Sequence, residues 1–216
     1  LGEFYHKKVI ANISGFSIED YVYSCERISR EEKVGIVEVN ISCPNVHNGG
    51  MAFGTTASGA AEVTRAVRKV VKKPLYMKLS PNVSDITEIA AACEAEGADG
   101  ISMINTLLGM RVDIYKKRPV LANITGGISG GAILPLSLRM VWQTYERIKI
   151  PIIGMGGISN AEEAVEMMLC GATAIQVGAA NLVNPYAMKE IIEGLDEILD
   201  KMKVQSIKEI IGGAHG

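Results

Sequence analysis

Short apolar runs alternate with helix-like segments six times along this chain of 216 residues. The apolar runs, which predict strands, are residues 8–14, 34–41, 75–80, 100–105, 150–155 and 174–177. Their centres are apolar, as in strands that are buried on both faces. Successive runs begin roughly 25 to 50 residues apart, with helix-like segments between them. This alternation predicts parallel β-α-β architecture rather than sequence-local hairpins.

Composition narrows the choice of protein class. With 216 residues, of which 48% are hydrophobic, the chain can bury one substantial core, and we predict one domain over residues 1–216. A net charge of −2 gives no sign of the positively charged surface that nucleic-acid binding requires. The four cysteines show no C-x-x-C spacing, so no metal site and no disulfide framework are predicted, and a cytoplasmic location fits. No apolar run approaches the roughly 20 residues that span a bilayer, so no membrane association is predicted.

Polar or glycine residues recur where the predicted strands end. They are Asn12, Cys43, Lys78, Asn105, Gly156 and Gly178. In a β/α barrel, the carboxyl ends of the strands form the face that carries the active site. A doubly wound open sheet would instead concentrate its phosphate-binding glycines after the first strand, which is not seen here. A barrel needs eight strands and the chain starts at Leu1, so we predict a (β/α)8 TIM barrel whose first two β-α units are missing from this chain.

The stretch around Cys43 is the first candidate site. The apolar run 34–41 leads into Ser42, Cys43 and Pro44, and Pro44 cannot continue a hydrogen-bonded ladder, so the thiol stands at the tip of the strand. A cysteine can also be a small buried hydrophobic residue. Here the neighbouring Asn40 and Asn45 and the glycine-rich loop 46–55, which could close over a substrate, favour a functional thiol.

Glycines and one lysine form the second candidate site. Gly156 with Gly157, and Gly178 with Ala179, follow the last two strands and precede predicted helices, where free backbone N–H groups can bind phosphate. Tight turns are the alternative explanation. The cluster at 126–131 would let a flat ligand approach the backbone. Lys78 lies on an apolar strand and needs a charged or electron-rich partner unless it reaches solvent.

Six motifs together resemble one known family. They are N-I-S-C-P-N (40–45), K-L-S-P-N (78–82), I-N-T (104–106), G-G-I-S-G (126–130), G-M-G-G-I (154–158) and V-G-A-A (177–180). In this order they resemble the class 1 dihydroorotate dehydrogenases, which are FMN-binding β/α barrels of pyrimidine biosynthesis. The loop N-G-G-M-A-F-G-T (48–55) resembles the class 1B branch, whose catalytic subunit passes electrons to NAD through a partner subunit with FAD and an iron–sulfur cluster.

The resemblance assigns roles to individual residues. It implies that Cys43 removes a proton from C5 of dihydroorotate while a hydride leaves C6 for the flavin, and that Asn40, Asn105 and Thr106 hold the substrate. Lys78 would face the N1–O2 edge of the flavin. The cofactor-binding residues that it implies are Asn12, Asn40, Lys78, Ile104, Gly130, Gly156, Gly157, Gly178 and Ala179. It also implies a homodimer of the catalytic subunit within a heterotetramer.

Two departures from the family pattern leave alternatives open. Nothing before Leu1 supplies the substrate-contacting lysine and the asparagine-rich loop of the family's first two β-α units. Ala179 stands where a hydroxyl residue often follows the glycine, so one phosphate hydrogen bond is lost. The alternatives are a fumarate-dependent class 1A enzyme, a phosphate-binding barrel without redox chemistry, and a non-catalytic remnant.

Overall fold

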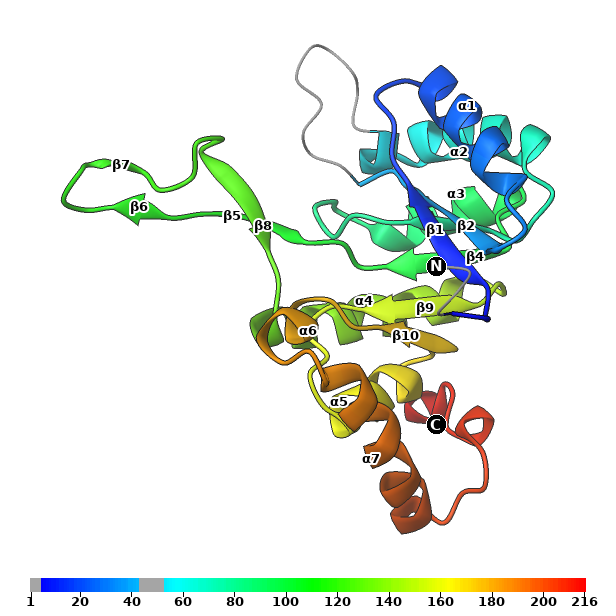
Figure 1. The fold of residues 1–216 in the computed structure, drawn as a ribbon, viewed down its shortest axis with the longest axis vertical. Coiled ribbons are helices and arrows are strands. Elements are labelled where there is room, and N and C mark those ends of the chain that lie inside the picture. The colour runs from blue at the N-terminus through cyan, green and yellow to red at the C-terminus, as the bar shows by residue number, and fades with distance from the viewer. Residues whose placement is uncertain (1–4, 43–52) are drawn as a thin grey trace.

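A single parallel sheet organises the chain. The computed structural model describes residues 5–42 and 53–216. The strands of the sheet, in spatial order, are β1 (Val9–Ile13), β2 (Val34–Asn40), β3 (Leu75–Lys78), β4 (Gly100–Met103), β9 (Ile152–Met155) and β10 (Ala174–Gln176). All neighbours in this order pair in parallel, and the sheet curls into a half-barrel with β1 and β10 at its two edges (Figure 1). The six predicted strands are therefore confirmed, whereas closure into eight strands stays a prediction.

Five helices of the described chain cover one face of the sheet. They are α1 (Ile18–Ser29), α2 (Ala57–Val70), α3 (Ile86–Ala95), α4 (Leu134–Arg147) and α5 (Ala161–Leu169). Helix α6 (Ala179–Val183) follows the end of β10, and α7 (Ala187–Met202) packs on α5. Single 3-10 turns lie at Phe53–Thr55, Gly131–Ile133, Ile207–Glu209 and Gly213–His215. Consecutive helices pack side by side, α1 on α2, α2 on α3 and α3 on α4, as repeated β-α units require (Figure 1).

Side-chain caps fix where the helices begin. Ser17 and Asp20 form a reciprocal capping box at the start of α1, and Asp85 and Asn160 cap α3 and α5. Helix α2 begins at Ala57, and the hydroxyl of the preceding Thr56 accepts from the Gly59 N–H. The sequence does not predict helix α6, since five residues carry too little periodic pattern.

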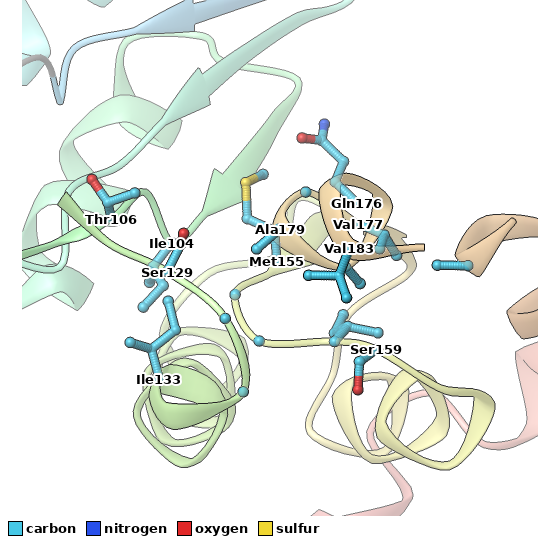
Figure 2. A pocket seen from close by; sticks show the side chains of 18 of the residues that line it. Ile104, Thr106, Ser129, Ile133, Met155, Ser159, Gln176, Val177, Ala179 and Val183 are labelled. Atoms are coloured by element: carbon cyan, nitrogen blue, oxygen red, sulfur yellow. The ribbon is translucent and has the colours of Figure 1, made fainter. Parts of the chain in front are cut away.

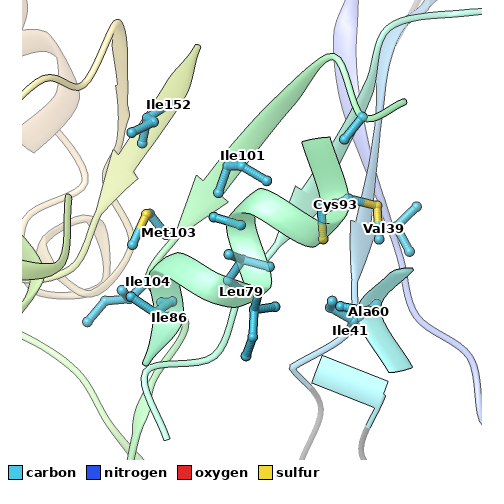
Figure 3. Close-up of a cluster of buried hydrophobic side chains, with 14 of the residues drawn as sticks. Val39, Ile41, Ala60, Leu79, Ile86, Cys93, Ile101, Met103, Ile104 and Ile152 are labelled. Atoms are coloured by element: carbon cyan, nitrogen blue, oxygen red, sulfur yellow. The ribbon is translucent and has the colours of Figure 1, made fainter. Parts of the chain in front are cut away.

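The two faces of the sheet differ in chemistry. Alternate residues such as Val39, Ile101 and Met103 are fully buried against the helices (Figure 3). The register places the residues between them on the opposite, concave face, since Asn12 pairs with Glu38 and Lys78 with Ser102. That inner face is unusually polar for a barrel interior. It therefore offers groups for chemistry as well as for packing.

The segment 106–131 forms a hairpin excursion between β4 and α4. Strand β5 (Leu107–Met110) pairs antiparallel with β8 (Thr125–Ile128), and further out β6 (Val112–Asp113) pairs with β7 (Arg118–Pro119). Figure 1 shows this arm projecting away from the sheet. Asn82 ties its base to the end of β3, because the Asn82 Nδ2 donates to the Thr106 carbonyl at 3.0 Å and Asn82 Oδ1 accepts from the Leu108 N–H at 2.8 Å.

Two fully buried threonines allow a matched stability test. The Thr144 hydroxyl has no hydrogen-bond partner among the described residues, whereas the Thr64 hydroxyl donates to the Ala60 carbonyl at 2.7 Å. We expect Thr144→Val to leave the free energy of unfolding unchanged or raise it, because it removes an unsatisfied polar atom. Thr64→Val is expected to lower it by about 1 kcal/mol. Urea unfolding of the purified protein measures both, and an equal loss in the two variants would contradict this.

Candidate cofactor and substrate site

A cavity of about 440 Å³ opens at the carboxyl ends of β3, β4, β9 and β10 (Figure 2). Residues from the strand ends, the base of the hairpin arm and helix α6 line it. They are Lys78, Ile104, Asn105, Thr106, Ser129, Gly130, Gly131, Ile133, Met155, Gly156, Gly157, Ile158, Ser159, Gln176, Val177, Gly178, Ala179, Ala180, Val183, Asn184 and Ala187. This is the face on which β/α barrels carry their active sites.

The loop after β9 needs its two glycines for geometric reasons. Gly156 and Gly157 have φ angles of 123° and 90°, a region that side chains disfavour. A Cβ atom on Gly157 would lie 2.7–2.8 Å from atoms of Leu134, so the loop packs directly against the start of α4. The Ser137 hydroxyl donates to the Gly156 carbonyl at 2.6 Å and holds the loop in place. The backbone of this loop thus forms a fixed wall of the cavity.

Other glycines leave room instead of making a tight contact. A Cβ atom added at Gly130, Gly131 or Gly178 would meet nothing within 4 Å. All three residues line the cavity, so bare backbone faces open space there. Such a surface lets a ligand approach backbone N–H groups closely, which suits a phosphate or a flat ring.

Lys78 brings a positive charge into the cavity. Its side chain is half-buried at the end of β3. The ammonium makes no hydrogen bond and no ion pair with any residue in the described part of the chain. A half-buried ammonium without a protein partner is suited to an anionic or electron-rich ligand group.

The predicted substrate residues form a connected polar cluster. The Asn105 Nδ2 donates to Asn40 Oδ1 at 3.3 Å and to the Ser42 hydroxyl, which itself donates to Asn40 Oδ1 at 2.6 Å. Asn105 Oδ1 accepts from the Thr106 N–H at 2.8 Å. Asn105 and Thr106 line the cavity, and Asn40 lies behind them. Residues from the ends of β2 and β4 are thereby held in one orientation.

Most of the predicted cofactor residues meet in this cavity. Lys78, Ile104, Gly130, Gly156, Gly157, Gly178 and Ala179 line it. Asn12 and Asn40 are not among the lining residues, and Asn12 instead contacts Glu38. Sequence reasoning did not single out Gln176 or Val183, although Gln176 lies one residue before the end of the predicted strand 174–177 and so carried a usable signal.

Cys43 and loop residues 46–52 lie outside the described residues, so the predicted base and most of the predicted lid are not placed. The other three thiols are poor bases. Burial raises the pKa of Cys25 and of Cys93 to about 12, and burial followed by the nearby Glu166 carboxylate raises the pKa of Cys170. None of these three lines the cavity.

A parallel β/α half-barrel with a lysine and bare glycines at its strand ends defines a β/α enzyme site for an anionic ligand with a flat or phosphorylated part. The comparison with known families makes this specific. The profile of the dihydroorotate dehydrogenase family matches residues 3–199, and the chain belongs to this family of oxidoreductases.

Bacterial relatives share half or more of their aligned residues with the chain. Proteins named dihydroorotate dehydrogenase B (NAD(+)), catalytic subunit, are 56% identical in Parabacteroides distasonis, 54% in Desulforamulus reducens and 52% in Halalkalibacterium halodurans. The alignments cover 94–96% of this chain and 67–68% of those proteins. In the part of the chain that the structure describes, no helix combines the length and apolarity needed to cross a membrane.

Proposed function

We propose that the chain is the catalytic subunit of an NAD-linked, class 1B dihydroorotate dehydrogenase, which oxidises dihydroorotate to orotate with FMN in pyrimidine biosynthesis. The observation that carries this proposal is the cavity in which the unpaired Lys78 ammonium and bare glycine backbone meet at the strand ends. The names of relatives that are 51–56% identical support the same activity.

The lining residues fit FMN. Lys78 would stabilise negative charge on the pyrimidine edge of the ring, and Ile104 would pack against the ring. Backbone groups of Gly130, Gly156, Gly157, Gly178 and Ala179 would hold the ribityl phosphate. Ala179 contributes no hydroxyl hydrogen bond there. When bound, FMN supplies a hydride acceptor.

The chain's own polar groups would orient the substrate and move its proton. Asn105 and Thr106 face the cavity, and Asn40 fixes Asn105, so these residues would hold the ring amides and carboxylate of dihydroorotate. Cys43 follows the same strand end as Asn40 and would remove the C5 proton as general base. A thiol of ordinary acidity needs help near neutral pH, which Ser42 could give through a relay.

We extend the proposal to the fold. The sheet would be part of an eight-stranded, FMN-binding barrel domain, with two further β-α units, missing from this chain, filling the gap between β10 and β1. Two observations support this. Both edge strands lack a second neighbour among the described residues, and Ile10 on β1 is 40% exposed although it lies on the concave face. The relatives named above are also longer than this chain.

The proposed partners follow from class 1B. The relatives are named as catalytic subunits, which supports a separate partner subunit, and we assign to it FAD and an iron–sulfur cluster. The catalytic subunit would be a homodimer within a cytoplasmic heterotetramer. The class 1A alternative, which uses fumarate, is disfavoured by the class 1B pattern of residues 48–55.

Purified natural-length protein is expected to be yellow, to release FMN on denaturation, and to lose its flavin absorption when dihydroorotate is added without oxygen. Reoxidation by NAD should require the partner subunit, and fumarate should not replace NAD. A colourless protein that binds no added FMN would contradict the proposal and favour a barrel without redox chemistry.

A further inference from the structure

Glu38 occupies an unusual position inside the half-barrel. It lies in the middle of β2 on the concave face and is only 2% exposed. Its Oε2 accepts a hydrogen bond from Asn12 Nδ2 on β1, and its Oε1 accepts one from Gln176 Nε2 on β10 at 3.0 Å. One carboxylate thus links the two edge strands of the sheet through the interior. The linked residues are 26 and 138 positions away in sequence.

The charge of Glu38 is not neutralised by a neighbouring cation. Within residues 5–42 and 53–216, Glu38 forms no ion pair, and its hydrogen-bond partners are the two amides. A buried carboxylate is costly unless its oxygens are well satisfied, and a hydrophobic residue would serve packing alone at least as well. The position next to a ligand cavity points to a role beyond packing.

The chemistry of the carboxylate determines how both amides are turned. An ionised carboxylate only accepts hydrogen bonds, so Asn12 and Gln176 must each direct their NH₂ group toward it. Their carbonyl oxygens are then turned elsewhere, and neither receives a hydrogen bond from a described residue. Gln176 lines the cavity beside Met155, with which it pairs in the sheet register (Figure 2). The hydrogen bond to Glu38 therefore leaves the carbonyl oxygen of Gln176, which is an acceptor, available to a ligand, and not its NH₂ group.

We infer that Glu38 is a positioning residue for the cofactor: its buried carboxylate, held from the other side by Asn12, fixes the amide orientation of Gln176, and so fixes the Gln176 carbonyl oxygen as an acceptor for an N–H group of the bound flavin. This inference rests on the proposed function. It adds two residues to those that would hold the flavin. Gln176 would contact the flavin in the cavity, and Glu38 would act indirectly, through its hydrogen bond to Gln176.

The variant Glu38→Gln tests this directly, because a glutamine has one acceptor and one donor where the carboxylate has two acceptors. The amide at position 38 can then donate to Gln176 as well as accept from it, so Gln176 is no longer held with its carbonyl oxygen free for the ligand. We expect about tenfold weaker FMN binding to apoprotein, the effect of one hydrogen bond to a buried group. The midpoint potential of bound flavin should rise, since an anion is lost and a donor gained near a ring that becomes more negative on reduction.

Two further variants serve as rescue and control. In Glu38→Gln combined with Gln176→Glu, the amide introduced at position 38 can donate to the new carboxylate at position 176 and still accept from Asn12, so most of the lost FMN affinity should return. Ser102→Ala changes a fully buried residue on the same concave face whose hydroxyl has no partner among the described residues. It should alter FMN affinity by less than about twofold, because no hydrogen bond is broken.

The outcomes separate this inference from the proposed function. Natural-length wild-type protein that binds no FMN overturns the proposed function itself. If the wild type binds FMN but Glu38→Gln has the same affinity and potential, only the Glu38 inference is overturned. Weaker binding with an unchanged midpoint potential also overturns it, since Glu38 would then be purely structural. If Glu38→Gln does not fold, Gln176→Met provides the same readouts, and an unchanged FMN affinity there overturns the inference.

Discussion

Replacing Cys43 with serine is expected to slow the reduction of bound flavin by dihydroorotate by about 10²–10⁴-fold, the usual cost of losing a general base. An alcohol is a far weaker acid than a thiol, so at neutral pH almost none of it is in the basic form. Stopped-flow absorbance of the natural-length protein, mixed with dihydroorotate without oxygen, measures this rate.

The flavin itself should remain bound in this variant, because the Lys78 side chain and the glycine walls of the cavity are unchanged. Cys170→Ser is the matched control. This thiol lies outside the cavity and has a raised pKa, so its loss should leave the rate unchanged. A Cys43→Ser variant that is reduced as fast as the wild type would remove Cys43 from the role of base.

Replacing Lys78 with methionine is expected to slow flavin reduction by about 10²–10³-fold, comparable to losing one preorganised group that stabilises developing negative charge. Methionine keeps much of the length and apolar stem of lysine and removes the charge. Because the ammonium has no partner among the described residues, its loss should leave no protein group unsatisfied and should change stability little. The midpoint potential of the flavin should fall, the opposite direction to that expected for Glu38→Gln.

Lys69→Met provides the control, since Lys69 lies on the exposed side of α2 and does not line the cavity. It removes the same charge far from the site. Redox titration with a reference dye compares the three proteins. An equal midpoint potential in wild type and Lys78→Met would show that Lys78 does not contact the flavin. An equal shift of the potential in Lys69→Met would show that the change in net charge alone explains the effect of Lys78→Met.

Local chemistry determined much of this fold from the sequence alone. Short apolar runs specified the six strands of the parallel sheet, because strands such as β4 and β9, buried on both faces, and β3, buried on alternate residues, leave an apolar pattern that needs no knowledge of neighbours. Ser17, Asp85 and Asn160 specified helix starts through their own side-chain hydrogen bonds. Parallel strands bring their carboxyl ends together, so the polar and glycine residues at those ends could be predicted to share one site. Those that line the cavity are Lys78, Asn105, Gly156 and Gly178.

The resemblance of the motifs to a family supplied the predictions that local pattern could not, namely a flavin cofactor, dihydroorotate as the substrate and the role of a base for Cys43. Tertiary structure decided the rest. The contact of Glu38 with Gln176 joins residues 138 positions apart, and it depends on the curl of the sheet, which no local pattern encodes. The register between β1 and β2 likewise decides whether the Asn12 side chain turns toward the cavity or toward Glu38. Side-chain direction across a curved interior is set by packing among distant strands, and so only the folded molecule specifies it.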